Sequence, residues 1–309
     1  MNIKKIGLTA LAGSLIATSA FAGSLSVSGG ASLEVQHNNG GAAAASNKGK
    51  AYTMGNSVTF TGSGELENGL NVSVSFELDQ AAADGTNGVF DSHSLKVGND
   101  TFGTVTFSGH GGSSAASSVG NAGGDIWDTF DGARGAVTAI AQSTAAAGNN
   151  SFFYTLPAVM DGVSIFANYV PQGASGLGGA TGMGITYTGV EGLSVSYGVG
   201  EVGDTTAGTG GREITTYKAS YAFGPVTAAM SMNDYDITGS TPNEEQSSYK
   251  ISYTVSDELS VSYGAETVDL TGDSTDAEFD KVAVSYTTGG MTLSGSMINA
   301  EGGANSATA

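Results

Sequence analysis

The sequence predicts an all-β protein, an up-and-down antiparallel β-barrel that crosses a membrane, from three features of its pattern. Apolar and polar residues alternate over about fifteen segments, short turns and long polar loops alternate between them, and an export signal precedes them. Residues 69–80 (GLNVSVSFELDQ) carry apolar residues on one phase, namely Leu70, Val72, Val74, Phe76 and Leu78. Because successive strand side chains point to opposite faces, this segment has one apolar and one polar face.

The first 22 residues are expected to be a signal peptide. Lys4 and Lys5 precede a short apolar run, and Ala20-Phe21-Ala22 form an A-x-A cleavage site. The run is shorter than the roughly 20 apolar residues that a spanning helix needs. The mature chain is therefore expected to start at Gly23, and residues 23–309 are expected to form one domain.

Fifteen segments with period-two alternation follow along the mature chain. They are residues 24–36, 56–66, 69–80, 93–98, 102–109, 150–157, 162–170, 183–189, 193–202, 215–224, 226–234, 248–256, 259–268, 280–289 and 291–298. Turns built on Gly, Asn, Asp or Pro alternate with longer loops at roughly 37–54, 81–90, 110–149, 171–182, 203–213, 235–247 and 270–278. Short turns on one rim and long loops on the other are what an up-and-down barrel produces.

Lysines and several acids within the strands fall on the polar phase, the acids being Glu34, Glu65, Glu77, Asp79 and Glu266. The lysines Lys96, Lys218, Lys250 and Lys281 all fall on the polar phase. This placement keeps charge away from lipid, where a basic residue at midplane costs ~2–4 kcal/mol. A soluble sheet with one solvated face would show the same segregation. Tyrosines near strand ends, such as Tyr187 and Tyr263, suit an interfacial girdle as well as cross-strand packing.

Composition excludes several classes of function. The formal net charge is −19, and it becomes −21 when the two lysines of the signal peptide are removed, which disfavours nucleic acid and favours cations. The absence of cysteine excludes disulfides and thiol chemistry. His37, His93 and His110 are scattered, and the pair Glu244 and Glu245 is expected in a solvated turn. The sequence therefore predicts neither an enzyme nor a bound cofactor, although loop acids leave Ca²⁺ binding open without any specifying ligand spacing.

The loop at residues 110–149 interrupts the strand pattern for about forty residues. Asp125, Asp128 and Asp131 cluster there beside Trp127, the chain's one tryptophan, and Arg134. A loop of this length within a compact domain is normally functional.

Over essentially its whole mature length, the chain resembles the general diffusion porins of Gram-negative outer membranes. The resemblance covers the signal peptide, the hairpin series, the third long loop and a post-loop hairpin that carries Asn150, Ser151, Tyr154, Pro157, Gly162, Ser164 and Tyr169. It implies a sixteen-stranded barrel, a homotrimer in the lipid of the outer membrane, and passive diffusion of ions and small hydrophilic solutes. It also implies a third loop folded into the pore, with acids that face basic residues on the wall.

Carried onto this chain, the resemblance places Asp125, Asp128, Asp131 and Arg134 in the constriction. The mature chain has only two arginines. The candidates for the basic residues of the facing wall are therefore three polar-phase lysines, Lys96, Lys218 and Lys250. The transverse field across the pore is expected to be weaker than in arginine-rich relatives. Because acids outnumber bases, we expect a preference for cations.

The end of the sequence departs from the family pattern. After Ile298 the chain ends in INAEGGANSATA, without a further alternating segment or a terminal aromatic residue. Bacterial single-chain barrels have an even number of strands, so we expect that a closing strand is missing and that residues 25–35 form an unpaired edge. The alternative reading of the whole chain is an exported β-rich surface-layer or adhesin protein.

Overall fold

The structure, a computed structural model, describes residues 23–38, 49–79, 90–127, 149–171, 178–203, 211–237, 243–270 and 276–302. The expected signal peptide lies outside these ranges. Within them, fifteen antiparallel strands form one sheet in which each strand pairs with its neighbours in sequence. No helix of these ranges is long and apolar enough to cross a membrane.

The strands follow the predicted order, and most of them run somewhat beyond their alternating segments. They are β1 (Ser24–Asn38), β2 (Gly49–Glu65), β3 (Asn71–Asp79), β4 (Ser92–Asn99), β5 (Gly103–His110), β6 (Ser151–Thr155), β7 (Val163–Val170), β8 (Ala180–Tyr187), β9 (Leu193–Val202), β10 (Arg212–Phe223), β11 (Val226–Ile237), β12 (Glu244–Thr254), β13 (Leu259–Leu270), β14 (Ala277–Thr288) and β15 (Met291–Gly302). One short helix, α3 (Ala115–Val119), follows β5.

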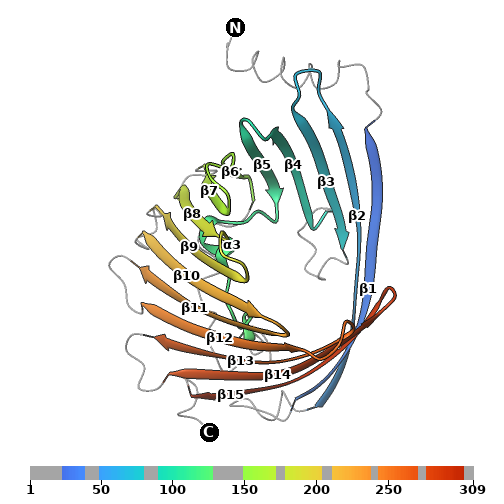
Figure 1. The fold of residues 1–309 in the computed structure, drawn as a ribbon, viewed down its shortest axis with the longest axis vertical. Coiled ribbons are helices and arrows are strands. Elements are labelled where there is room, and N and C mark those ends of the chain that lie inside the picture. The colour runs from blue at the N-terminus through green and yellow to red at the C-terminus, as the bar shows by residue number, and fades with distance from the viewer. Residues whose placement is uncertain are drawn as a thin grey trace.

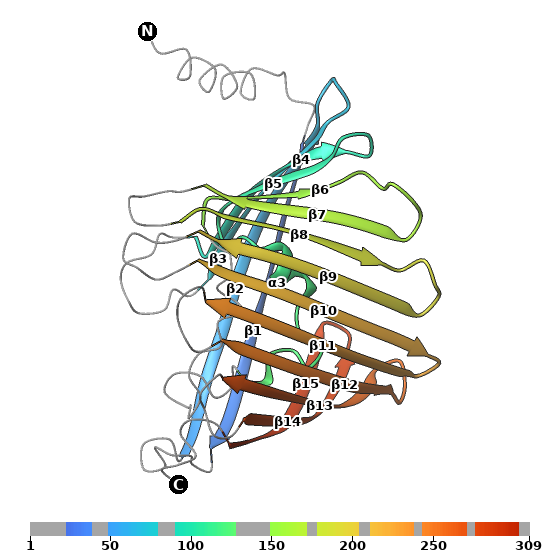
Figure 2. The ribbon, with the colours of Figure 1, turned by 90° about the vertical axis from the view of Figure 1, so that its left-hand side faces the viewer.

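Short turns join the strands in pairs at one rim of the sheet, as the sequence predicts (Figure 2). The tightest are Gly224-Pro225 between β10 and β11 and Gly289-Gly290 between β14 and β15. Gly224 and Gly289 have φ angles of 55° and 56°, which glycine adopts without the steric penalty that other residues meet. These turns fix the register of each hairpin, and with it the face on which every side chain lies.

The sheet curls so that α3 lies on its concave side (Figure 1). Residues paired across strands point to the same face, so contacts with the α3 segment identify the concave phase throughout the sheet. This phase carries most strand serines and asparagines, including Ser231 and Ser248, and the lysines Lys96, Lys218, Lys250 and Lys281. The opposite, convex phase carries most of the apolar strand residues, of which Met232 and Ile251 are each about half exposed, at 54% and 52%. The apolar faces therefore point away from the enclosed space, which we call the lumen.

The pairing order begins at β1 and ends at β15. Each of these strands has one neighbour, β2 and β14 respectively, and the described residues contain no ladder between β1 and β15. This pairing order is consistent with the expected edge along residues 25–35. The expectation of a further closing strand stays a prediction.

Candidate functional site

The described part of the third loop, residues 111–127, lies against the concave face of the sheet (Figures 1 and 2). It opens with α3, whose N-terminus is held by a capping box. The Ser117 backbone N–H donates to Ser114 Oγ at 3.0 Å, and the Ser114 N–H donates to Ser117 Oγ at 2.9 Å. These bonds satisfy donors that a helix start leaves without partners, so a five-residue helix can form on the wall.

Strands β7 to β11 hold α3 by close packing and by a buried hydrogen bond. The Ala115 N–H donates to Asn168 Oδ1 of β7 at 2.7 Å. Ala116 packs with Ile214 and Tyr235, and Val119 packs with Phe166. At Gly198 of β9, a Cβ atom would lie 3.0 Å from the Ala115 carbonyl oxygen and 3.0 Å from Val119 Cγ2. A glycine at this position therefore lets the helix lie directly on the strand.

The chain after α3 crosses β11 and β12, where wall hydroxyls accept its backbone N–H groups. The Ala122 N–H donates to Ser231 Oγ at 2.9 Å, and the Gly123 N–H donates to Ser248 Oγ at 2.6 Å. Asn233 Nδ2 donates to Asn121 Oδ1 and, at 3.1 Å, to Gln246 Oε1. An irregular segment thus finds partners for its buried amides on the polar phase of the strands.

The last described part of the loop is held against β13 and β14. The Trp127 N–H donates to Glu266 Oε2 at 3.2 Å, and Ser248 Oγ donates to Glu266 Oε1 at 3.4 Å. Ile126 and Trp127 form an apolar cluster with Val268, Ala277 and Phe279. Residues 114–127 therefore follow the wall from β7 to β14, held by alternating polar and apolar contacts.

The structure brings one of the predicted loop acids close to one of the predicted lysines. Asp125, with φ at 53°, accepts hydrogen bonds from Asn121 Nδ2 and, at 3.4 Å, from Trp127 Nε1. Lys218 Nζ donates to the Asn121 carbonyl oxygen at 3.1 Å and lies near enough to Asp125 for their charges to attract. Asp128, Asp131 and Arg134 lie outside the described residues.

The other two predicted lysines lie on the same face but in different surroundings. Lys250 of β12 lines a hollow in the wall together with Gly123 of the loop. Lys96 of β4 pairs in register with Ser73 and Thr106 and has no hydrogen bond or ion pair with a described residue. The described part of the chain thus gathers Asp125, Lys218 and Lys250 around the loop, and it leaves Lys96 apart from them.

Sequence reasoning did not identify the wall residues that hold the loop. The contact of Glu266 with Trp127 joins residues 139 positions apart, and no local pattern indicates it. The expectation of a solvated turn at Glu244 and Glu245 is wrong. Both residues belong to β12, and Glu244 is buried on the concave phase because that strand starts earlier than its alternation indicates.

The described residues contain no group of three or more His, Cys, Asp or Glu side chains that could hold a metal ion. The candidate site is therefore built from hydrogen-bonding side chains and isolated charges on the wall of the lumen.

Several solved structures share this fold. The anion-selective porin from Comamonas acidovorans is 17% identical with a TM-score of 0.68, and the match covers 89% of this chain and 88% of that chain. A second porin is 16% identical with a TM-score of 0.67 over 91% of this chain and 96% of that chain. OmpT, an outer membrane protein of Vibrio cholerae, is 13% identical with a TM-score of 0.62 over 92% and 88%. At these identities the likeness establishes the fold alone.

No curated protein sequence matches the chain. A family model described as Gram-negative porin, in contrast, matches residues 7–295, which is nearly the whole sequence. The match argues against the alternative of a surface-layer or adhesin protein. Together with the curled fifteen-stranded sheet and the loop on its concave face, it shows that the chain belongs to the Gram-negative porins.

Proposed function

We propose that this porin forms a water-filled channel through which ions and small hydrophilic solutes diffuse passively, without a catalytic step. The observation that carries the proposal is the third-loop segment on the concave wall, because a segment placed there narrows the lumen. The polar phase of the strands lines the same space, and polar linings suit hydrated solutes.

A preference for cations is part of this proposal. Acids outnumber bases on the concave phase of the described strands by six to five. The acids there are Glu34, Glu65, Glu77, Asp79, Glu244 and Glu266, and the bases are Lys96, Lys218, Lys250, Lys281 and Arg212. The mature chain also carries a formal net charge of −21 once residues 1–22 are removed from the −19 of the full sequence. A lumen with this sign of charge concentrates cations.

Planar-bilayer recordings test the channel and its selectivity together. In a salt gradient, we expect stepwise conductance with a reversal potential displaced toward the cation equilibrium potential. The same preparation, left unboiled, should migrate differently on a denaturing gel from a boiled sample, because a folded barrel resists detergent. Absence of conductance from a heat-modifiable preparation would overturn the proposed channel, and a displacement toward the anion potential would overturn the cation preference alone.

The three loop acids are expected to contribute to this preference. Replacing Asp125, Asp128 and Asp131 together by asparagine should lower the cation preference, because three negative charges leave the constriction. Asparagine keeps an acceptor oxygen and tolerates the positive φ of Asp125, so the fold should persist. The reversal potential and the heat-modifiable band are the two measurements. An unchanged reversal potential would place these carboxylates outside the conduction path.

Lipid and neighbouring subunits are expected to surround the channel. The exported chain would lie in the Gram-negative outer membrane as a homotrimer, with lipid against the convex apolar phase. It would require no cofactor and no nucleic-acid partner. The exposed convex residues support the lipid contact, since side chains such as Met232 and Tyr217 have no second protein layer over them among the described residues.

A further inference from the structure

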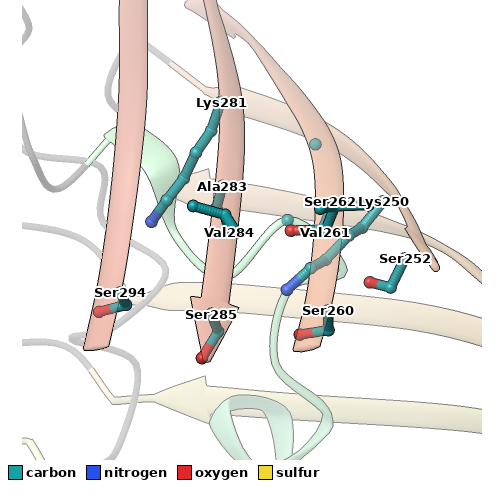
Figure 3. A pocket seen from close by; sticks show the side chains of 12 residues that line it. Lys250, Ser252, Ser260, Val261, Ser262, Lys281, Ala283, Val284, Ser285 and Ser294 are labelled. Carbon is teal, nitrogen blue, oxygen red and sulfur yellow. The ribbon is translucent and has the colours of Figure 1, made fainter. Parts of the chain in front are cut away.

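A hollow of about 260 Å³ opens in the concave wall between β12 and β15, beside Gly123 of the third loop (Figure 3). Two lysines, Lys250 and Lys281, extend into it, and serine hydroxyls from four neighbouring strands line it. We call it the lysine–serine hollow, defined by Lys250, Lys281, Ser252, Ser260, Ser285 and Ser294.

The register of the sheet explains why the two lysines meet. Lys250 of β12 and Lys281 of β14 both pair with Gly264 of the strand between them. Their Cα atoms therefore lie at the same level, about 10 Å apart for a spacing of two strands. Gly264 has no side chain to fill the space between them. The loop closes the hollow above this glycine, where a Cβ would lie 3.3 Å from Ile126 Cδ1 and 3.7 Å from Gly123 Cα.

The hydroxyls form an ordered row below the two ammonium groups (Figure 3). Ser260 pairs with Ser285, and Ser285 pairs with Ser294, so these three side chains lie side by side on adjacent strands. Ser252 of β12 extends the row on its other side. Each hydroxyl can rotate to donate a hydrogen bond toward the space above it.

Acidic side chains are absent from the described residues that line the hollow. Neither Lys250 nor Lys281 forms an ion pair or a hydrogen bond with another described residue. The nearest acid along β13 is Glu266, two positions from Gly264, and its oxygens accept from Trp127 N–H and Ser248 Oγ instead. The hollow therefore concentrates hydrogen-bond donors and positive charge without a carboxylate of its own.

Ammonium groups donate hydrogen bonds and accept none, so such a lining fits an acceptor-rich anion and disfavours a cation. We propose that the lysine–serine hollow is a binding site for small oxyanions, such as inorganic phosphate or the phosphate or carboxylate group of a small solute. This proposal rests on the proposed function only in one respect: the ligand would reach the site through the lumen of the channel. Occupancy would neutralise positive charge on the wall and so reinforce the preference for cations.

Inorganic phosphate is a suitable probe, added at millimolar concentration to both sides of a bilayer that holds the wild-type channel in constant potassium chloride. We expect a saturable change in conductance and a shift of the reversal potential toward the cation potential. Lys281→Gln should raise the half-saturating phosphate concentration by about tenfold or more, because a charged hydrogen-bonding partner is lost. The matched control is Lys96→Gln, which removes the same charge from the same face outside the hollow.

Calorimetric titration of phosphate into the detergent-solubilised protein measures binding without conduction. Binding by the wild type and the Lys96→Gln variant, with loss in Lys281→Gln, would support the site even if no channel opened. A conducting wild-type channel that shows neither calorimetric binding nor a phosphate effect would overturn the site while leaving the proposed function intact. Equal losses in both variants would also overturn it, because they would indicate general attraction to a positive lumen.

Discussion

Replacement of Val74 by arginine should destabilise the folded barrel in lipid by about 2–4 kcal/mol, the usual penalty for a basic residue at the bilayer midplane. Val74 lies in the middle of β3 on the convex phase, paired with Gly62 and Leu95. Because its neighbour on the same phase, Phe76, is 38% exposed, an arginine at Val74 would enter the apolar surface and not a packed core.

The adjacent residue supplies the control. Ser75 pairs with Thr61 and Ser94 on the concave phase, which it shares with Glu77. Arginine at Ser75 would stay in water near an acid and should alter stability by no more than about 0.5 kcal/mol. Denaturant titrations of the two variants in lipid vesicles, followed by the unboiled gel band, measure the difference. Equal stabilities, or a larger loss for Ser75→Arg, would show that the two faces have been assigned the wrong way round.

Replacement of Glu266 by alanine should loosen the loop from the wall. Glu266 is 1% exposed and accepts from the Trp127 N–H and from Ser248 Oγ. A buried donor left without its acceptor costs about 1–3 kcal/mol, so the population of loop segments detached from β13 should rise. The strand ladder of β13 uses backbone groups and should remain intact.

Trp127 reports this change directly, because it is the only tryptophan of the chain and is 6% exposed. In Glu266→Ala its fluorescence should shift to the red and become more accessible to a neutral quencher. Glu266→Gln keeps an acceptor oxygen and should resemble the wild type more closely. Glu245→Ala, on the opposite phase of β12, controls for the loss of a carboxylate. Wild-type emission from Glu266→Ala would show that Glu266 does not hold the loop.

The strands and their two faces could be predicted from the sequence because they depend on local properties. Alternation with a period of two, ended by turns such as Gly224-Pro225 and Gly289-Gly290, can be recognised from neighbouring residues alone. The phase of Lys218, Lys250 and Lys281 followed from the same alternation. The unusual length of the loop after β5, which indicated a functional role, is likewise visible in the local sequence. Local alternation failed at Glu244, where the strand continues into residues that lack an apolar phase.

The convergence of side chains at the loop depended on the tertiary structure. Trp127 and Glu266, Ala122 and Ser231, and Gly123 and Ser248 are all more than 100 positions apart, so only the curl of the sheet brings them into contact. The position of α3 depends likewise on which residues of β9 the loop contacts.

By itself, the sequence determined the class of fold, the order of the strands, and the face on which Lys96, Lys218, Lys250 and Lys281 lie, because these follow from backbone geometry over a few residues. Only the tertiary structure decided that Lys250 and Lys281 share a hollow across Gly264 and that Asp125 lies near Lys218. The physical reason is strand register. Alternation sets which face a side chain occupies, whereas its level on the wall depends on the pairing of every strand in between.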